Sequence, residues 1–172
     1  SYTGPIGSGS FDADAVLGEP DGTSWALGGG VGNPNGTITL SFDNGFIIDG
    51  IGADFIVYDS YGVEEGFFIE ASQDGTTFHA IGTYSGITSD TTIRTFAWGT
   101  SFATYVDLAL SSLTSANFLR LTVAPSIATN YPQGYDLDAI EAINYDPVPI
   151  PSSILLLGLG LLGRAGMNRK KQ

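Results

Sequence analysis

Short runs of residues that alternate between polar and apolar, each ended by a turn signal, recur through most of this chain. Residues 37–42 read Thr-Ile-Thr-Leu-Ser-Phe and follow the period of two of a strand with one buried face. Residues 66–72 and 77–83 flank Asp74 and Gly75, and an Asp-Gly pair between two strand-like runs predicts a β-hairpin. Further strands are predicted at residues 51–58, 93–97, 103–108, 117–123 and 139–145. Eight or more short strands with local turns predict an all-β fold, an antiparallel sandwich of the jelly-roll type.

The composition agrees with a single domain that has its own core. The chain has 172 residues, of which 24 are glycine and none is cysteine. Residues 11–146 are numerous enough to bury a full core, so the predicted sandwich needs no disulfide bond. Residues 1–10 are rich in glycine and serine, and we expect them to form a flexible N-terminal arm.

The last residues follow a different pattern. A hinge rich in proline and serine at 147–153 precedes an apolar run at 154–163, and a basic cluster at 169–171 follows. We expect residues 154–172 to form a short hydrophobic helix with a basic end. Read as a helix, the apolar run is about 15 Å long, half of the ~30 Å hydrocarbon core of a bilayer. A segment this short calls for shelter by lipid or by sister molecules, because alone it is marginal as a membrane span.

This order of hinge, apolar segment and basic end resembles the PEP-CTERM sorting tail of exported bacterial proteins, which the family's exosortase recognises. Ile150 stands where that family carries an acidic residue. The resemblance implies export to the bacterial cell surface or extracellular matrix, with the membrane or an exosortase as the partner of the tail. The sorting and anchoring residues would be Val148, Pro149, Pro151, Ile154, Leu155, Leu156, Leu157, Leu159, Leu161, Leu162, Arg169, Lys170 and Lys171.

Charge is divided unevenly between the domain and the tail. All eighteen acidic residues and two arginines lie in residues 11–146, which gives the domain a net charge of −16. The other four basic residues give the tail +4, which brings the chain to its net −12. An acidic domain repels phosphate backbones, which argues against nucleic acid as a partner. The opposite charges favour a salt-sensitive contact between the domain of one copy and the tail of another.

A second resemblance covers the domain. Residues 69–78 are similar to the strand–turn–strand element of discoidin-like, galactose-binding sandwiches, and residues 117–123 are similar to a later strand of that family. The domain also resembles surface domains that open with a V-L-G-x-P-D-G element, here residues 16–22, and close with D-L-D-A, here residues 136–139. These likenesses imply a sandwich fold and leave the ligand open.

Two pairs of aspartates with the same spacing are the candidate metal ligands. Asp12 and Asp14 lie near the start of the domain, and Asp136 and Asp138 lie near its end, followed by Glu141. Residues two apart on a strand share one face, and the first and last strands of such sandwiches often meet. These carboxylates could therefore converge around Ca²⁺, which takes six to eight oxygen ligands. The alternative is that they are solvated turn residues that keep an acidic protein soluble.

Catalytic patterns are absent from the sequence. His79 is the one histidine and there is no cysteine, so neither a zinc site nor a Cys–His pair can be assembled. No G-x-S-x-G element accompanies His79, which we expect to lie on a strand surface. Arg120, one of the two basic residues of the domain, is expected to pair with a carboxylate or to pack on an aromatic ring. The sequence therefore predicts a protein that is not an enzyme.

Three functions remain from the sequence, one of which is a surface hydrolase whose paired carboxyl groups would cleave a glycosidic bond. The other two are not enzymes. The first is an exported structural protein of the cell surface that associates with copies of itself into a filament, sheath or matrix, with the tail as anchor or packing helix. The alternative is a tail-anchored carbohydrate-binding module that recognises a surface polysaccharide. In that case tyrosines in predicted loops would stack on sugar rings, with Tyr61, Tyr131 and Tyr135 as the candidates.

Overall fold

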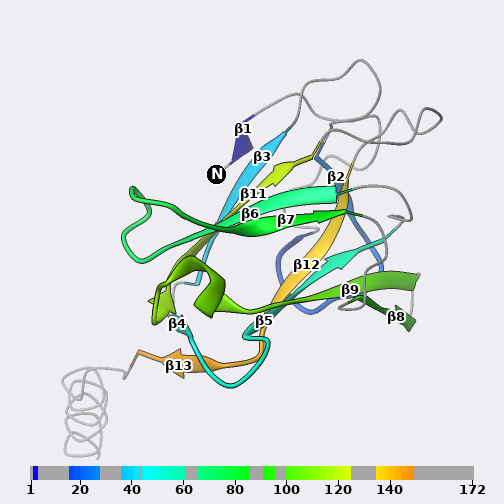
Figure 1. Ribbon diagram of the computed structural model, residues 1–172. Helices are drawn as coiled ribbons and strands as arrows, with labels where there is room; N and C mark the ends of the chain where they lie inside the picture. The colour runs from blue at the N-terminus through cyan, green and yellow to red at the C-terminus, as the bar shows by residue number, and fades with distance from the viewer. Residues whose placement is uncertain are drawn as a thin grey trace, which may run out of the picture.

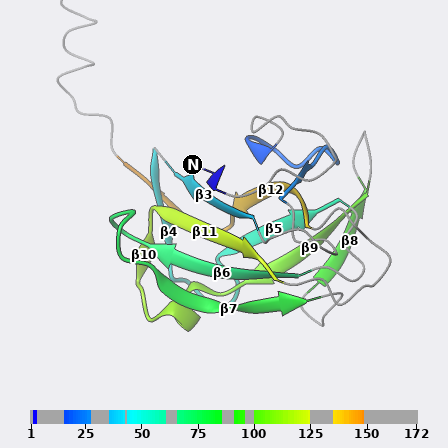
Figure 2. The same cartoon turned by 90° about the horizontal axis from the view of Figure 1, so that it is seen from above.

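The computed structural model describes residues 2–3, 16–27, 36–42, 44–60, 66–85, 91–95, 100–124 and 135–148. Over these ranges the chain forms two five-stranded antiparallel sheets and a three-stranded sheet at one end of the domain (Figure 1). Figure 2 shows the strands of the two larger sheets as two layers. Both of these sheets contribute side chains to one hydrophobic core. This confirms the predicted all-β, antiparallel sandwich.

The first sheet has the strand order β1-β3-β11-β6-β7. Its strand β11 shows why the sequence forms it: Leu119, Leu121 and Val123 are buried, and the residues between them are partly exposed, as a half-buried strand requires. The predicted hairpin around Asp74 and Gly75 is present as the β6–β7 pair. The bounds are β1 Tyr2–Thr3, β3 Thr37–Ser41, β11 Phe118–Val123, β6 Gly66–Ser72 and β7 His79–Ser85.

The second sheet has the strand order β2-β12-β5-β9-β8. Its central strand β5 is buried at every position, because both of its faces are covered. Phe55 and Val57 belong to the main core, whereas Ile56 and Tyr58 belong to a second, smaller apolar cluster. The bounds are β2 Trp25–Ala26, β12 Asp136–Ala142, β5 Phe55–Asp59, β9 Thr100–Val106 and β8 Thr91–Thr95.

The third sheet closes one end of the sandwich. It consists of β10 (Ser115–Ala116), β4 (Gly45–Ile48) and β13 (Tyr145–Pro147), with β4 in the middle. A one-turn 3₁₀ helix, η2 (Leu108–Ser111), is capped at its N-terminus by Asp107. The side chain of Asp107 accepts a hydrogen bond from the backbone N–H of Ala109. Figure 1 shows β13 at this end, where the described part of the chain stops at residue 148.

The structure corrects the predicted strand boundaries in this region. The strand predicted at 51–58 begins at Phe55, because Asp54 hydrogen-bonds the backbone of Gly50 and so holds the preceding residues in a turn. The strand predicted at 139–145 is divided between β12 and β13, and β4 was not predicted. The predicted arm is described only at residues 2–3, and the hinge and the hydrophobic tail lie outside the described residues beyond 148. Within the described ranges no helix has the length and apolarity that crossing a membrane requires.

Candidate functional site

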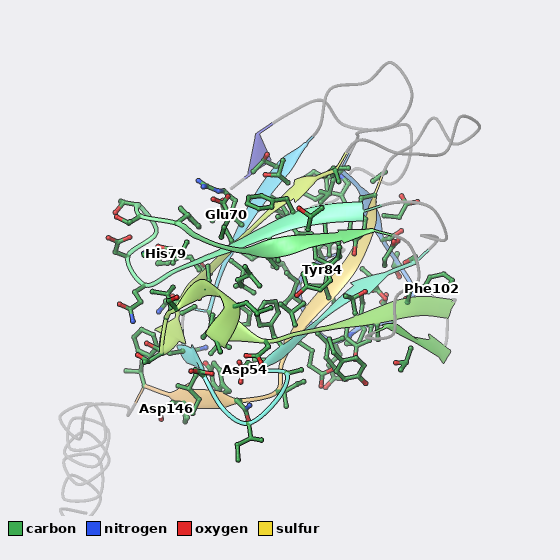
Figure 3. All side chains as sticks on the ribbon, in the orientation of Figure 1. Asp54, Glu70, His79, Tyr84, Phe102 and Asp146 are labelled. Atoms are coloured by element: carbon green, nitrogen blue, oxygen red, sulfur yellow. The ribbon has the colours of Figure 1, made fainter. Side chains whose placement is uncertain are left out.

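The outer face of the first sheet carries a row of polar side chains across three strands. The antiparallel register places Arg120 on β11 beside Thr39 on β3 and beside Glu70 on β6. All three are partly exposed, since the alternate residues of these strands supply the core. Figure 3 shows Glu70 on this sheet. A base, an acid and a hydroxyl therefore lie next to one another on a rigid sheet rather than on loops.

The guanidinium of Arg120 is held from two sides. Its Nε donates a 2.7 Å hydrogen bond to Glu70 Oε2, and its central carbon lies 3.9 Å from the centre of the Phe78 ring. The hydrogen bond to Glu70 favours the charged form and raises the pKa of Arg120 above its ordinary value. The two side chains are 34% and 16% exposed, so the pair fixes the orientation of the guanidinium while leaving it accessible. This confirms the expectation that Arg120 pairs with a carboxylate or packs on an aromatic ring.

The β6–β7 turn borders the same face. Asp74 Oδ1 accepts 2.8 Å hydrogen bonds from the backbone N–H groups of Thr76 and Thr77, which holds the pKa of Asp74 well below its usual range. Gly75 has a φ of +72°, and a Cβ at this position would lie 3.1 Å from the Phe118 ring. The turn therefore needs glycine both for its backbone conformation and for its close approach to β11.

These elements border a groove with a volume of about 480 Å³, within the range of small-molecule sites. Arg120 is hydrogen-bonded to Glu70 through Nε, and its side chain is 34% exposed within this groove. The hydroxyls of Thr37 and Thr122 lie 3.1 Å apart on neighbouring strands and share a hydrogen bond. The lining residues are Thr37, Thr39, Glu70, Gly75, Phe78, Arg120 and Thr122.

The sequence predicts only part of this groove. The sequence singled out Arg120 because it is one of two basic residues in the domain. It did not predict Glu70, Phe78 or the threonines as its neighbours, because they lie far from Arg120 in sequence. The alternation of β3, β6 and β11 marks which residues face outward, but only the strand order brings them together. To predict the groove, one would have to know that the strand at residues 37–42 pairs with the strand at residues 117–123.

A second hollow of about 420 Å³ lies over the second sheet. Tyr58 on β5 donates a 2.6 Å hydrogen bond to Glu141 Oε2 on β12, and Gly18, Glu19 and Pro20 complete the lining. Tyr58 is buried and Glu141 is exposed. The tyrosine hydroxyl is thus committed to the carboxylate, and this hollow offers a ligand fewer polar groups than the groove on the first sheet.

The two sequence elements of the surface-domain resemblance meet in the structure. Asp138, in the D-L-D-A element, accepts hydrogen bonds from the backbone N–H groups of Asp21 and Gly22, at 3.3 and 3.1 Å, in the P-D-G element. Asp138 Oδ2 also accepts a 2.7 Å hydrogen bond from Ser101 on β9. The buried carboxylate therefore fastens residues 21–22 to β12 and to β9, and we assign it a structural role.

The predicted calcium ligands do not form one ligand set within the described residues. Asp138 is committed as above, and Glu141 accepts the hydrogen bond of Tyr58. Asp138 also occupies a bulge between Leu137 and Ala139, which breaks the alternation that was expected to place Asp136 and Asp138 on one face. Burial raises the pKa of Asp136 to about 6. The other two predicted ligands, Asp12 and Asp14, lie outside the described residues.

A different group of carboxylates lies at the end of the sandwich that β13 closes. Oxygen atoms of Asp49, Asp54 and Asp107 all lie within 4.8 Å of one another, and the group could hold a metal ion. It would supply three of the six to eight oxygens that Ca²⁺ takes. The side chain of Asp54 already accepts three hydrogen bonds, from Gly50 and Leu108 backbone N–H groups and from Asn144 Nδ2. Calcium binding stays a prediction, which the melting temperature in millimolar Ca²⁺ and in chelator would test, with Asp49→Asn as the matched variant.

The remaining predicted residues have varied outcomes. Tyr135 is wrong as a glycan-stacking residue, because it is 2% exposed and packs edge-on against Phe67 with ring centres 5.1 Å apart. Tyr61 and Tyr131 lie outside the described residues. His79 is exposed at the start of β7, as expected for a surface histidine (Figure 3). Val148 is the one described residue of the predicted anchor; it is exposed, and its N–H donates to the carbonyl of Asn44.

No family model and no curated protein matches the chain. Solved structures that are similar to it include the following three. The C-terminal domain of a chitobiase from Bacteroides fragilis has a TM-score of 0.41 and 16% identity, and the match covers 67% of this chain and 66% of that one, just under two thirds of its length. CBM32-3 from a family 31 glycoside hydrolase of Clostridium perfringens has a TM-score of 0.45 and 14% identity over 86% of this chain and 91% of that one.

The third is CpGH89 from Clostridium perfringens, solved in complex with its substrate GlcNAc-alpha-1,4-galactose. It has a TM-score of 0.44 and 12% identity over 87% of this chain, and the match spans 15% of that longer chain. At these identities and TM-scores no residue role and no activity passes from the three proteins to this chain.

Proposed function

We propose that this domain is a non-catalytic carbohydrate-binding module of the bacterial cell surface, and that it binds a neutral glycan in the groove on the first sheet. The observation that carries the proposal is the Arg120–Glu70 pair, held over the Phe78 ring within a groove of about 480 Å³. Of the functions predicted from the sequence, the carbohydrate-binding module is now the main proposal. The structural protein becomes the second candidate.

The chemistry of the groove matches the chemistry of a sugar. A sugar presents adjacent hydroxyl groups that both donate and accept hydrogen bonds, and a planar guanidinium beside a carboxylate offers donors and acceptors at fixed positions. Hydrogen bonds to charged groups are the stronger ones, and the polar side chains of Thr37, Thr39 and Thr122 line the same groove. The Phe78 ring supports the guanidinium of Arg120 from below and adds apolar surface to the lining of the groove.

Charge narrows the class of glycan. Arg120 and Glu70 offset each other in the groove, and the domain as a whole carries a net charge of −16 from the sequence. An acidic polysaccharide would be repelled by the domain, over about 30 Å at 0.01 M ionic strength and about 8 Å at 0.15 M. A neutral glycan is not repelled by the charge of the domain, which supports a neutral ligand.

Two features support binding without catalysis. Glycoside hydrolysis needs two carboxyl groups on opposite sides of the bond that breaks. Among the described residues that line the groove, Glu70 is the one carboxylate, and it is bonded to Arg120. The proposal therefore gives Glu70 the role of a hydrogen-bond acceptor for the ligand and of the partner that orients Arg120.

A glycan array followed by isothermal titration calorimetry on the full chain would test the proposal. We expect neutral glycans to bind, and Arg120→Ala and Glu70→Ala to weaken binding about tenfold or more. His79→Ala is the matched control, because this exposed residue lies on the neighbouring strand β7 outside the groove. Binding that survives both groove substitutions would place the ligand elsewhere, and an array with no neutral glycan bound would end the proposal.

A structural role at the cell surface is the second candidate function. Apolar residues exposed near β4 and β13 favour it, because solvent-exposed apolar patches mark contacts with other molecules. Export and anchoring through the tail, by membrane or exosortase, are part of both proposals and depend on the sequence pattern at residues 148–171. Mass spectrometry of the native protein would establish whether that tail is kept.

A further inference from the structure

Exposed apolar side chains gather at one end of the sandwich. Seven large hydrophobic side chains are exposed in the described part of the chain, and five of them belong to the segments 44–60 and 141–148. We call this surface the apolar end. It comprises Ile48, Ile51, Ile143 and Val148, of which Ile51 is fully exposed. Tyr145 pairs with the buried Ile47, so its side chain lies on the other face of the β4–β13 pair.

The apolar end is rigid rather than a set of loose loops. The N–H of Ile48 donates to the carbonyl of Asn144, and the N–H of Ile143 donates to the carbonyl of Asp54, with bonds of 2.9 and 2.7 Å. Strand β13 also pairs with β4 along its whole length. The buried Asp54 carboxylate fixes Gly50 on one side and Asn144 on the other. Backbone and side-chain hydrogen bonds thus link the two segments that carry these exposed apolar side chains, and a pre-organised surface loses less conformational entropy when it binds a partner.

Acidic side chains surround this surface. Asp49 and Asp146 are exposed, and Asp107 is partly exposed close to Asp49. Figure 3 shows Asp146 on β13 and Asp54 toward the same end. The segments 44–60 and 141–148 contain no lysine or arginine. The surface therefore fits a partner that is apolar in its centre and basic at its edge, and it repels anionic lipid headgroups.

The chain itself carries a segment with this chemistry. Residues 154–163 are apolar, and Arg164, Arg169, Lys170 and Lys171 follow them. The tail joins the domain at Val148, within the apolar end. The apolar run of the tail matches the apolar side chains of this surface. The basic end of the tail matches the acidic side chains beside them.

The hinge favours a tail from another molecule. Val148 and Ile150 each precede a proline, and a residue before proline avoids the helical region and favours extended backbone. Five residues, 149–153, would span at most about 17 Å in an extended conformation. We propose that the apolar end is a docking surface for the tail, residues 154–171, of a second copy. Such a contact joins unlike surfaces, so each copy can both give a tail and receive one, and assemblies can grow.

Sedimentation velocity of the full chain across a concentration series would test this surface. We expect concentration-dependent association, and the double variant Ile51→Ser, Ile143→Ser should weaken it about tenfold or more, because both side chains would be buried in the contact. Leu17→Ser is the matched control: this side chain is also exposed and apolar, and it belongs to another segment of the chain. Circular dichroism would verify that all variants are folded. Equal loss in the control variant would overturn the assignment of the surface.

A mixing experiment shows whether the surface of one copy receives the tail of another. One full-length variant carries the two serine substitutions in the apolar end, and another carries Arg169→Glu, Lys170→Glu and Lys171→Glu in the tail. Each should associate poorly alone, whereas the mixture should form heterodimers, since one partner keeps the surface and the other keeps the tail. Adding Asp49→Lys and Asp146→Lys to the tail variant should restore part of its association by exchanging the charges. A mixture that behaves like its separate components would overturn the proposal.

Two outcomes would assign the surface to a different occupant. A wild-type chain that stays monomeric while its tail is protected from protease would show that the tail docks on its own domain. Flotation with vesicles of 3:1 neutral to anionic phospholipid tests lipid directly. If the serine variant lost vesicle binding but associated normally with itself, the surface would be a lipid contact, and the proposal would be wrong. Glycan binding in the groove is measured separately, so failure here leaves that function untouched.

Discussion

Asp54 and Asp136 are both buried carboxylates of the same domain, but they have different surroundings. Asp54, just before β5, accepts hydrogen bonds of 2.7–2.8 Å from three donors on three separate segments. Asp136, at the start of β12, has no such compensation among the described residues, and burial raises its pKa to about 6. A buried carboxylate therefore holds segments together when hydrogen-bond donors surround it, and it lowers the free energy of unfolding when they do not. We call the first kind a clamp.

The largest expected effect comes from removing the clamp. Asp54→Ala leaves the N–H groups of Gly50 and Leu108 and the amide of Asn144 without their acceptor, in a region where Asp54 is fully buried. We expect the free energy of unfolding to fall by about 3 to 5 kcal/mol. Urea unfolding followed by tryptophan fluorescence measures it. A loss below about 1 kcal/mol would show that the three hydrogen bonds do not organise this end of the domain.

Asp138 sharpens the comparison as a clamp of intermediate strength. Its carboxylate accepts from the N–H groups of Asp21 and Gly22 at 3.3 and 3.1 Å and from Ser101 at 2.7 Å. Because two of these bonds are longer than those of Asp54, we expect Asp138→Ala to lower the free energy of unfolding by about 2 to 3 kcal/mol. Amide hydrogen exchange should increase at residues 21–22 first. Unchanged exchange at these residues would contradict the role of Asp138 as their fastener.

The sequence predicted elements that depend on local patterns, and it missed what depends on strand pairing. Residues 37–42 and the Asp74–Gly75 turn carry their structure in their own alternation and turn chemistry, and both formed as predicted. Asp136 and Asp138 were expected to share a face because they are two residues apart, but a bulge at Asp138 is set by its partners on other segments. Nothing in the sequence marked Asp54, because an aspartate before a strand is common and two of its three donors, Leu108 and Asn144, come from distant parts of the chain.

Asp136→Asn tests the uncompensated member of the pair through pH. A carboxyl group whose pKa is raised on folding binds more protons in the native state, so the free energy of unfolding falls as pH rises from its ordinary pKa to about 6. The asparagine variant has no such charge to bury. We expect it to be more stable than the wild type by about 1 to 2 kcal/mol at pH 7 and similar to it below pH 4, in urea unfolding at both pH values. A gain that is equal at both pH values would not come from the charge.

Arg120→Ala should have the smallest effect on stability, because the Arg120–Glu70 pair is partly exposed and lies outside the core. Exposed ion pairs contribute little, so we expect the free energy of unfolding to change by about 0.5 kcal/mol. The same substitution should weaken glycan binding about tenfold or more, since the guanidinium is proposed to contact the ligand. Arg120→Lys keeps the charge but loses the planar fork, and it should recover stability without recovering affinity. If lysine restored binding in full, the groove would need only a positive charge there, and the proposed role of the planar guanidinium in binding sugar hydroxyls would be wrong.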